Sequence, residues 1–153
     1  MKVCDQYDHL RGLQNIMQKG ILLNELKEIL ADDLLLGKSS PKIIKKAIGE
    51  KFNDRGWADN VRVGNSKLTV SFLKSKVGVC FQIGNVARTY ADILKLSQLF
   101  KTGVIDVGVM IVPDKIESKK MGANYAKFDR LSNELKHFKD IIPIPILVLS
   151  LSN

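Results

Sequence analysis

Three polar side chains on a predicted β-hairpin are the residues of this chain best placed to do chemistry together. Along residues 68–83, apolar side chains alternate with other residues in both halves of the stretch, a period of two that is typical of strands. The apolar side chains then share one face of the hairpin, and the opposite face carries Ser71, Cys80 and Gln82. A hydroxyl, a thiol and an amide offer hydrogen bonds at neutral pH but no negative charge.

The turn of this hairpin is predicted at a polar pair, Lys74 and Ser75. A two-residue turn at this place puts Phe72 opposite Val77 and continues the pairing along both strands. In this register the three polar side chains lie on neighbouring strands.

Metal chemistry is not favoured by these three groups. Mg²⁺ prefers oxygen ligands, and its protein sites usually contain one or two carboxylates. Cys4 and Cys80 lack the spacing of zinc ligands, and His9 and His137 stand alone in the sequence. We therefore predict no metal site and no cofactor, and we expect both cysteines to be reduced thiols in a cytoplasmic protein.

Helical patterns precede the hairpin. Apolar residues recur at steps of three and four between residues 5 and 36. Ser40 and Pro41 provide a cap and a first-turn proline for a further helix that continues to about Phe52. We predict that residues 1–55 form a helical N-terminal part. The outer face of its last helix carries Lys42, Lys45, Lys46 and Lys51.

The chain after the hairpin alternates between helices and strands. Residues 86–100 and 124–138 have helical patterns, whereas the apolar runs 104–112 and 146–151 are typical of strands buried on both faces. The polar segment 113–122, which contains several lysines, is predicted to be a loop.

This order of elements predicts an α/β fold of three layers, a mixed central sheet of about four or five strands with helices on both sides. The 153 residues are the length of one domain, with residues 60–153 as its core. No apolar run is long enough to span a bilayer, so we expect no contact with membranes.

The chain is strongly basic. It has 24 Lys and Arg residues against 16 Asp and Glu residues, a net charge of +8, and its isoelectric point is about 9.5. Such a charge suits a nucleic-acid partner, but solubility alone also explains it. The arrangement of the charges must decide between the two.

A resemblance to a nuclease family rests on an ordered series of segments: Gly56-Trp57, VSFLKSKVGVCFQIGN, YADILKLSQLF, GVIDVGVMIVP and IPIPILVLSL. The series resembles the core of the type II restriction endonucleases of the BglII/BamHI group, in the PD-(D/E)XK nuclease superfamily. It covers roughly residues 43–151 and implies a restriction-endonuclease-like fold.

The resemblance also implies where catalytic residues belong. In that family the first hairpin strand carries an aspartate, and the second carries an acidic residue followed two positions later by Glu or Gln. These positions fall on Ser71, Cys80 and Gln82, and only Gln82 fits the pattern. The resemblance therefore implies a degenerate catalytic site, that of a pseudo-nuclease.

Duplex DNA is the partner that the resemblance implies, with the N-terminus of the 86–100 helix directed at the groove. Free amides at a helix N-terminus suit a phosphate, and Asn and Arg side chains bind base edges. The same helix region is the expected interface of a homodimer. The predicted DNA-binding residues are Lys74, Lys76, Asn85, Arg88, Thr89, Lys115, Lys119 and Lys120.

The sequence is compatible with three functions. The first is a catalytically inactive relative of a restriction endonuclease that binds double-stranded DNA. The second is a divergent Mg²⁺-dependent DNA endonuclease in which Glu50 supplies a displaced acid. The third is a regulatory or partner protein of an active nuclease that acts through protein contacts.

Three acidic residues have simpler explanations. Glu50 is expected to be a solvated helix residue near Lys46. Asp106 interrupts an apolar run and is expected to be a satisfied structural aspartate at a strand edge. Asp92 is expected to be exposed or at an interface.

Overall fold

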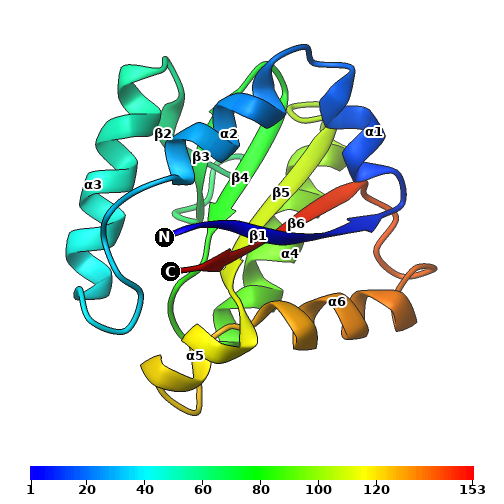
Figure 1. The fold of residues 1–153 in the computed structure, drawn as a ribbon. Helices are drawn as coiled ribbons and strands as arrows, with labels where there is room; N and C mark the ends of the chain where they lie inside the picture. Colours follow the sequence, from blue (N-terminus) through cyan, green and yellow to red (C-terminus); the bar gives the residue numbers. More distant parts are fainter.

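A six-stranded mixed sheet forms the centre of the computed structural model, which describes residues 1–153 (Figure 1). Its strand order is β1-β6-β5-β4-β3-β2, and β4, β5 and β6 run parallel to one another while the other pairs are antiparallel. The strands are β1 (Lys2–His9), β2 (Ala58–Arg62), β3 (Thr69–Lys74), β4 (Val77–Phe81), β5 (Val107–Pro113) and β6 (Ile146–Ser152).

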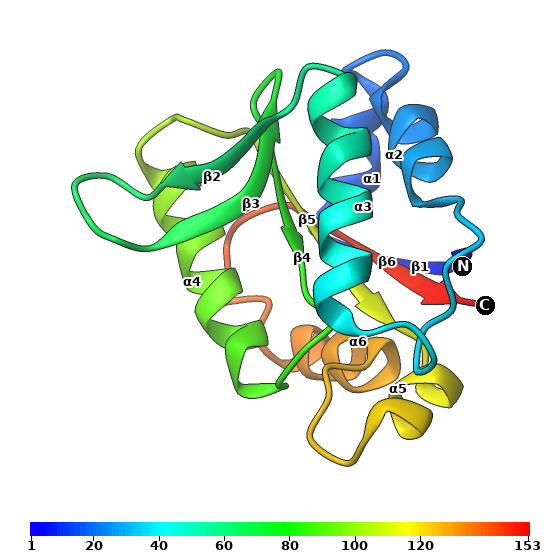
Figure 2. The same ribbon diagram turned by 90° about the vertical axis from the view of Figure 1, so that its left-hand side faces the viewer.

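Helices cover both faces of this sheet (Figure 2). They are α1 (Gly12–Met17), α2 (Leu22–Leu30), α3 (Pro41–Asp54), α4 (Ala87–Lys101), α5 (Lys115–Met121) and α6 (Phe128–His137). One apolar core joins the sheet to α1, α2 and α3, and a second joins it to α4 and α6. The predicted α/β fold of three layers is therefore confirmed, with six strands instead of four or five. No helix has both the length and the apolar character needed to cross a membrane.

The additional strand corrects the prediction for the N-terminal part. Residues 2–9 are an edge strand that pairs antiparallel with β6, and not the start of a helix. The apolar spacing that indicated a helix begins only at Leu10, because KVCDQYDH contains few apolar residues. Pairing with the buried strand β6 thus determines the conformation of a segment whose own pattern is weak.

The hairpin β3–β4 turns one residue later than predicted. Its turn residues are Ser75 and Lys76, with φ of 48° and 62°, the left-handed conformation that matches the twist of a two-residue hairpin. Phe72 therefore pairs with Val79, and not with Val77, which lies opposite Lys74.

Two glycines position α4 against the sheet. Gly78 and Gly108 are partners on the parallel strands β4 and β5. A β-carbon at either position would lie 3.0–3.1 Å from a methyl carbon of Leu96, which is fully buried. The missing side chains thus let α4 pack closely on the sheet.

The segment 113–122 is also a correction, because most of it is helical. Asp114 caps α5 by accepting a hydrogen bond from the Glu117 amide at 2.6 Å. A capping side chain satisfies a free backbone amide in the first turn of a helix. The polar composition of this segment is typical of a loop and therefore concealed the helix.

Candidate functional site

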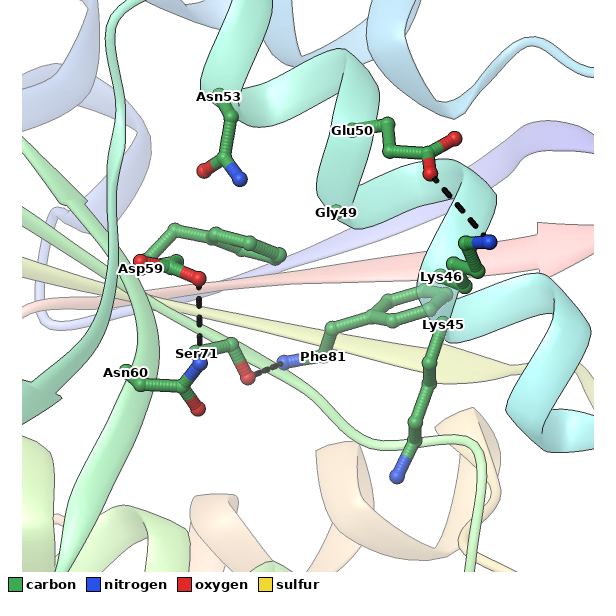
Figure 3. A pocket seen from close by; sticks show the side chains of 10 residues that line it. Lys45, Lys46, Gly49, Glu50, Asn53, Asp59, Asn60, Ser71 and Phe81 are labelled. Atoms are coloured by element: carbon green, nitrogen blue, oxygen red, sulfur yellow. Dashed lines mark hydrogen bonds and ion pairs between the residues drawn. The ribbon is translucent and has the colours of Figure 1, made fainter.

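A pocket of about 440 Å³ lies between α3 and the base of the β2–β3 ribbon (Figure 3). We call it the α3 pocket. Its lining is mostly polar and includes cations, carboxylates and amides: Lys45, Lys46, Gly49, Glu50, Asn53, Asp59, Asn60, Ser71, Phe72 and Phe81.

The sheet opens at Ser71, and this opening forms one wall of the pocket. Strands β3 and β4 pair only over Phe72–Lys74, and Asn60 on the neighbouring strand has φ of 47°. The Ser71 hydroxyl oxygen accepts a hydrogen bond from the Phe81 amide at 3.0 Å. The Ser71 side chain thus replaces the backbone carbonyl that would accept from this amide in a regular sheet. The Ser71 hydroxyl proton remains available to an acceptor in the pocket.

Cys80 and Gln82 lie close to Ser71 along the chain, but they point to the other side of the sheet. Phe81, which lies between Cys80 and Gln82 in the sequence, donates its amide to Ser71 and lines the α3 pocket. Neither Cys80 nor Gln82 lines this pocket. Cys80 is 1% exposed and packs in the core with Ile93 of α4. Burial raises the pKa of its thiol well above the ordinary value, so the group is an inert neutral thiol. The prediction of one shared polar face is therefore wrong, because the sheet distortion at Ser71 turns that residue toward α3.

Gln82 is engaged inside the protein. Its side-chain amide donates to the Asp92 carboxylate at 2.9 Å, and its oxygen accepts from the Gly84 amide at 3.1 Å. Lys95 donates to the second oxygen of Asp92 at 2.6 Å. Asp92 is only 7% exposed, which corrects the expectation of an exposed or interface residue.

Two carboxylates do line the α3 pocket, from elements outside the hairpin. Glu50 of α3 is directed at Lys46, with 3.9 Å between the charged groups. Asp59 of β2 accepts from the Asn60 side chain at 3.2 Å (Figure 3). No group of three or more His, Cys, Asp or Glu side chains is placed to hold a metal ion.

The three predicted catalytic positions do not fit Mg²⁺. Ser71 is neutral, Cys80 is enclosed in the core, and the Gln82 oxygen is already an acceptor. A hard divalent cation needs accessible oxygen ligands with negative charge, which these positions do not provide.

Lys45 is the cation of the α3 pocket that is not paired. It extends from α3 past the Phe81 ring, whereas Lys46 turns to Glu50 (Figure 3). Partial burial and then the Arg88 guanidinium lower the pKa of Lys45, and Asp92 opposes them. The pocket is therefore electrostatically linked to the N-terminal turn of α4, where Arg88 lies.

The predicted DNA-binding lysines of the hairpin have partners within the fold. Lys74 donates to Glu25 at 2.8 Å and to the Arg55 carbonyl at 2.6 Å. Lys76 lies 3.7 Å from Asp106, which also pairs with Lys19. Both lysines lie at the amino end of β4, roughly one strand length, about 15 Å, from the residues that follow β4. They do not share a surface with Asn85, and Lys74 is not free to bind a phosphate.

The N-terminal turn of α4 holds three further predicted residues. The Asn85 side chain accepts from the Ala87 amide at 2.8 Å and so caps the first turn. Arg88 is exposed. Thr89 is 2% exposed, and its hydroxyl has no partner, so it cannot contact DNA directly.

The last three predicted lysines belong to α5. Lys115 and Lys119 are exposed, and Lys120 donates to Glu117 at 2.8 Å. Helix α5 follows the carboxyl end of β5, and Asn85 follows the carboxyl end of the parallel strand β4. Helix α5 and the N-terminus of α4 therefore lie at the same end of the sheet, and with them Lys115, Lys119 and Arg88.

Several residues of the α3 pocket were not predicted as site residues: Lys45, Lys46, Gly49, Asn53, Asp59 and Asn60. The lysine-rich face of α3 was visible in the sequence, as was a glycine inside a helical pattern. Nothing in the sequence indicated Asp59 or Asn60, because β2 is a short and polar edge strand.

Comparison with known proteins agrees with this architecture. The family model described as "Restriction endonuclease BglII/BglIII" matches residues 7–151. No curated protein matches the chain.

Two solved structures have a similar fold. Restriction endonuclease BglII complexed with a DNA 16-mer superposes with a TM-score of 0.80 and 15% identity, over 100% of this chain and 77% of that one. Free BglII gives a TM-score of 0.70 and 17% identity, over 100% and 80% of the two chains.

Proposed function

Because the chain belongs to the BglII/BglIII family of restriction endonucleases, we propose that it binds double-stranded DNA without hydrolysing it. The observation that carries this proposal is the state of the hairpin: Ser71 is neutral, Cys80 is enclosed in the core, and Gln82 is bonded to Asp92. Metal-dependent hydrolysis uses the ion to polarise the phosphate and activate a water. The chain offers no charged ligand at the three positions where that ion would bind.

The charge of the chain supports binding. Its net charge is +8, and exposed Arg88, Lys115 and Lys119 belong to the end of the sheet at which α4 begins. Lysine and arginine side chains that neutralise phosphates supply most of the affinity of proteins for DNA. One of the similar structures is a complex of BglII with a DNA 16-mer, so this fold accommodates a duplex.

Fluorescence anisotropy with a labelled duplex, combined with an assay of supercoiled plasmid in Mg²⁺ or Mn²⁺, tests the proposal. We expect affinity that falls steeply with salt, and plasmid that stays supercoiled. Binding without a salt slope, or no binding, would favour a partner protein that acts through protein contacts. Nicking would favour an enzyme.

A second candidate function has one observation in its favour. Glu50 and Asp59 line the same pocket as Ser71, so a divergent Mg²⁺-dependent endonuclease would have two displaced carboxylates at its disposal. Nicking that is lost in both Glu50→Ala and Asp59→Ala, and kept in the charge-matched control Asp140→Ala, would establish this function in place of the first.

We also propose that two copies associate through α4. Its outer face exposes Ala87, Ala91 and Leu94, and Leu94 is 71% exposed. A wide apolar arc on a helix suits a partner surface. Analytical ultracentrifugation of the parent protein and of Leu94→Asp tests this, with a dimer expected only for the parent. A monomeric parent would contradict it.

A further inference from the structure

We propose that the α3 pocket is a metal-free site for one DNA phosphate, in which the Lys45 ammonium takes the place of the cation that the hairpin cannot bind. The inference rests on the proposed function, since it assigns a pocket to the phosphate contact of a duplex. No packing contact in the fold explains the glycine at position 49.

Gly49 lies inside α3, nine residues after the Ser40 cap, and lines the pocket. A β-carbon at this position would meet no heavy atom within 4 Å. Glycine destabilises a helix interior relative to alanine, and no packing contact here requires it. The missing side chain instead leaves open space on the pocket side of α3, next to the helix backbone.

The donors around this space suit an oxyanion. The Ser71 hydroxyl accepts from the Phe81 amide and keeps its own proton for a ligand. Lys45 is the unpaired cation, while Lys46 is directed at Glu50 (Figure 3). Partial burial lowers the pKa of Lys45, Arg88 on the opposite side of the sheet lowers it further, and Asp92 raises it. A phosphate near Lys45 and Arg88 reduces the repulsion between the two cations, which the Asp92 carboxylate, already bonded to Gln82 and Lys95, offsets only in part.

The two carboxylates of the pocket define the position of the phosphate. Asp59 of β2 accepts a hydrogen bond from the Asn60 side chain at 3.2 Å. Glu50 pairs with Lys46, one turn before it on α3. A phosphate is repelled from both and attracted to the end of the pocket where Lys45 extends. The pocket therefore binds the DNA backbone at one end only.

Anisotropy titrations of a labelled duplex at several salt concentrations test the inference, each in EDTA and in Mg²⁺. Lys45→Ala is expected to lose about tenfold in affinity and to reduce the salt slope by about 0.9, the value for one phosphate. Lys45→Arg is expected to retain the parent slope, and EDTA to change nothing. Lys139→Ala is the charge-matched control, because Lys139 is exposed and lies outside the pocket.

Gly49→Leu tests independently whether DNA occupies the open space of the α3 pocket beside Gly49. The leucine should fill the pocket and weaken DNA binding about tenfold, while the melting temperature stays at or above that of the parent. If the parent binds DNA with a salt slope that Lys45→Ala and Gly49→Leu leave unchanged, the inference is wrong and the proposed function stands. If the parent itself shows no salt-dependent binding, the proposed function fails.

Discussion

The side-chain amide of Gln82 donates to the carboxylate of Asp92 at 2.9 Å, inside the protein and outside the lining of the α3 pocket. Gln82 occupies the one hairpin position that matches the family pattern, and its oxygen is also used, by the Gly84 amide. A residue whose position implies catalysis has thus become part of the contact between the sheet and α4.

Gln82 and Asp92 should be coupled in stability. We expect Asp92→Ala to lower the free energy of unfolding by about 3 kcal/mol, because it leaves Lys95 and the Gln82 amide without an acceptor in a partly buried place. Gln82→Ala should cost less. Urea unfolding of both variants and of the double variant measures the coupling, and additive effects would contradict a direct contact.

Restoring acids to the hairpin should have unequal effects. Ser71→Asp places a carboxylate at the pocket and is expected to be tolerated. Cys80→Glu places one in the apolar core beneath α4, and should destabilise the protein by about 3 kcal/mol or more. Thermal unfolding of both variants with and without Mg²⁺ measures this. A Cys80→Glu protein as stable as the parent would show that the thiol is not enclosed.

Glu25 should make stability depend on acid pH. Burial alone raises its pKa, but hydrogen bonds from Lys74 and Trp57 outweigh burial and hold the pKa below the ordinary 4.5. The charged form is therefore favoured by folding, and its contribution is present above pH 4.5 and lost as the pH falls through the lower folded-state pKa.

The matched variant for this test is Glu25→Gln, which keeps the size of the side chain. We expect it to be less stable than the parent at pH 7 and the difference to shrink below about pH 4.5. Chemical unfolding across this range measures the difference. A constant difference would show that the charge of Glu25 is not involved.

Gly12 should tolerate no side chain. A β-carbon there would lie 2.2 Å from the carbonyl carbon of Ile146 in the backbone of β6, so α1 must shift to admit it. We expect Gly12→Ala to lower the free energy of unfolding by about 3 kcal/mol. Gly49→Ala is the control and should be neutral or slightly stabilising, because nothing lies near its β-carbon.

The sequence was sufficient for the parts of the fold that have a strong pattern. The buried strand 107–113 and helix 87–101 lie close to their predicted places, since each has apolar spacing of the right period. The edge strand β1 has no such pattern, and its conformation depends on pairing with β6. A distant partner cannot be inferred from the spacing of residues within a segment.

The site was harder to predict, because strand alternation fails where the sheet opens. Alternation places Ser71 on the side of Cys80, but β3 leaves β4 at Ser71 and turns its side chain to α3. The contacts of Gln82 with Asp92 and of Lys74 with Glu25 depend on how helices pack on the sheet. No rule of local spacing contains that information.

Incubation with supercoiled plasmid and Mg²⁺, followed on the same sample by salt-dependent duplex binding in EDTA, tests the central claim most directly. We predict duplex binding that is the same in both solutions and weakens with salt, with all of the plasmid left intact. Nicked or linear plasmid that requires Mg²⁺, or duplex binding that disappears in EDTA, would contradict it.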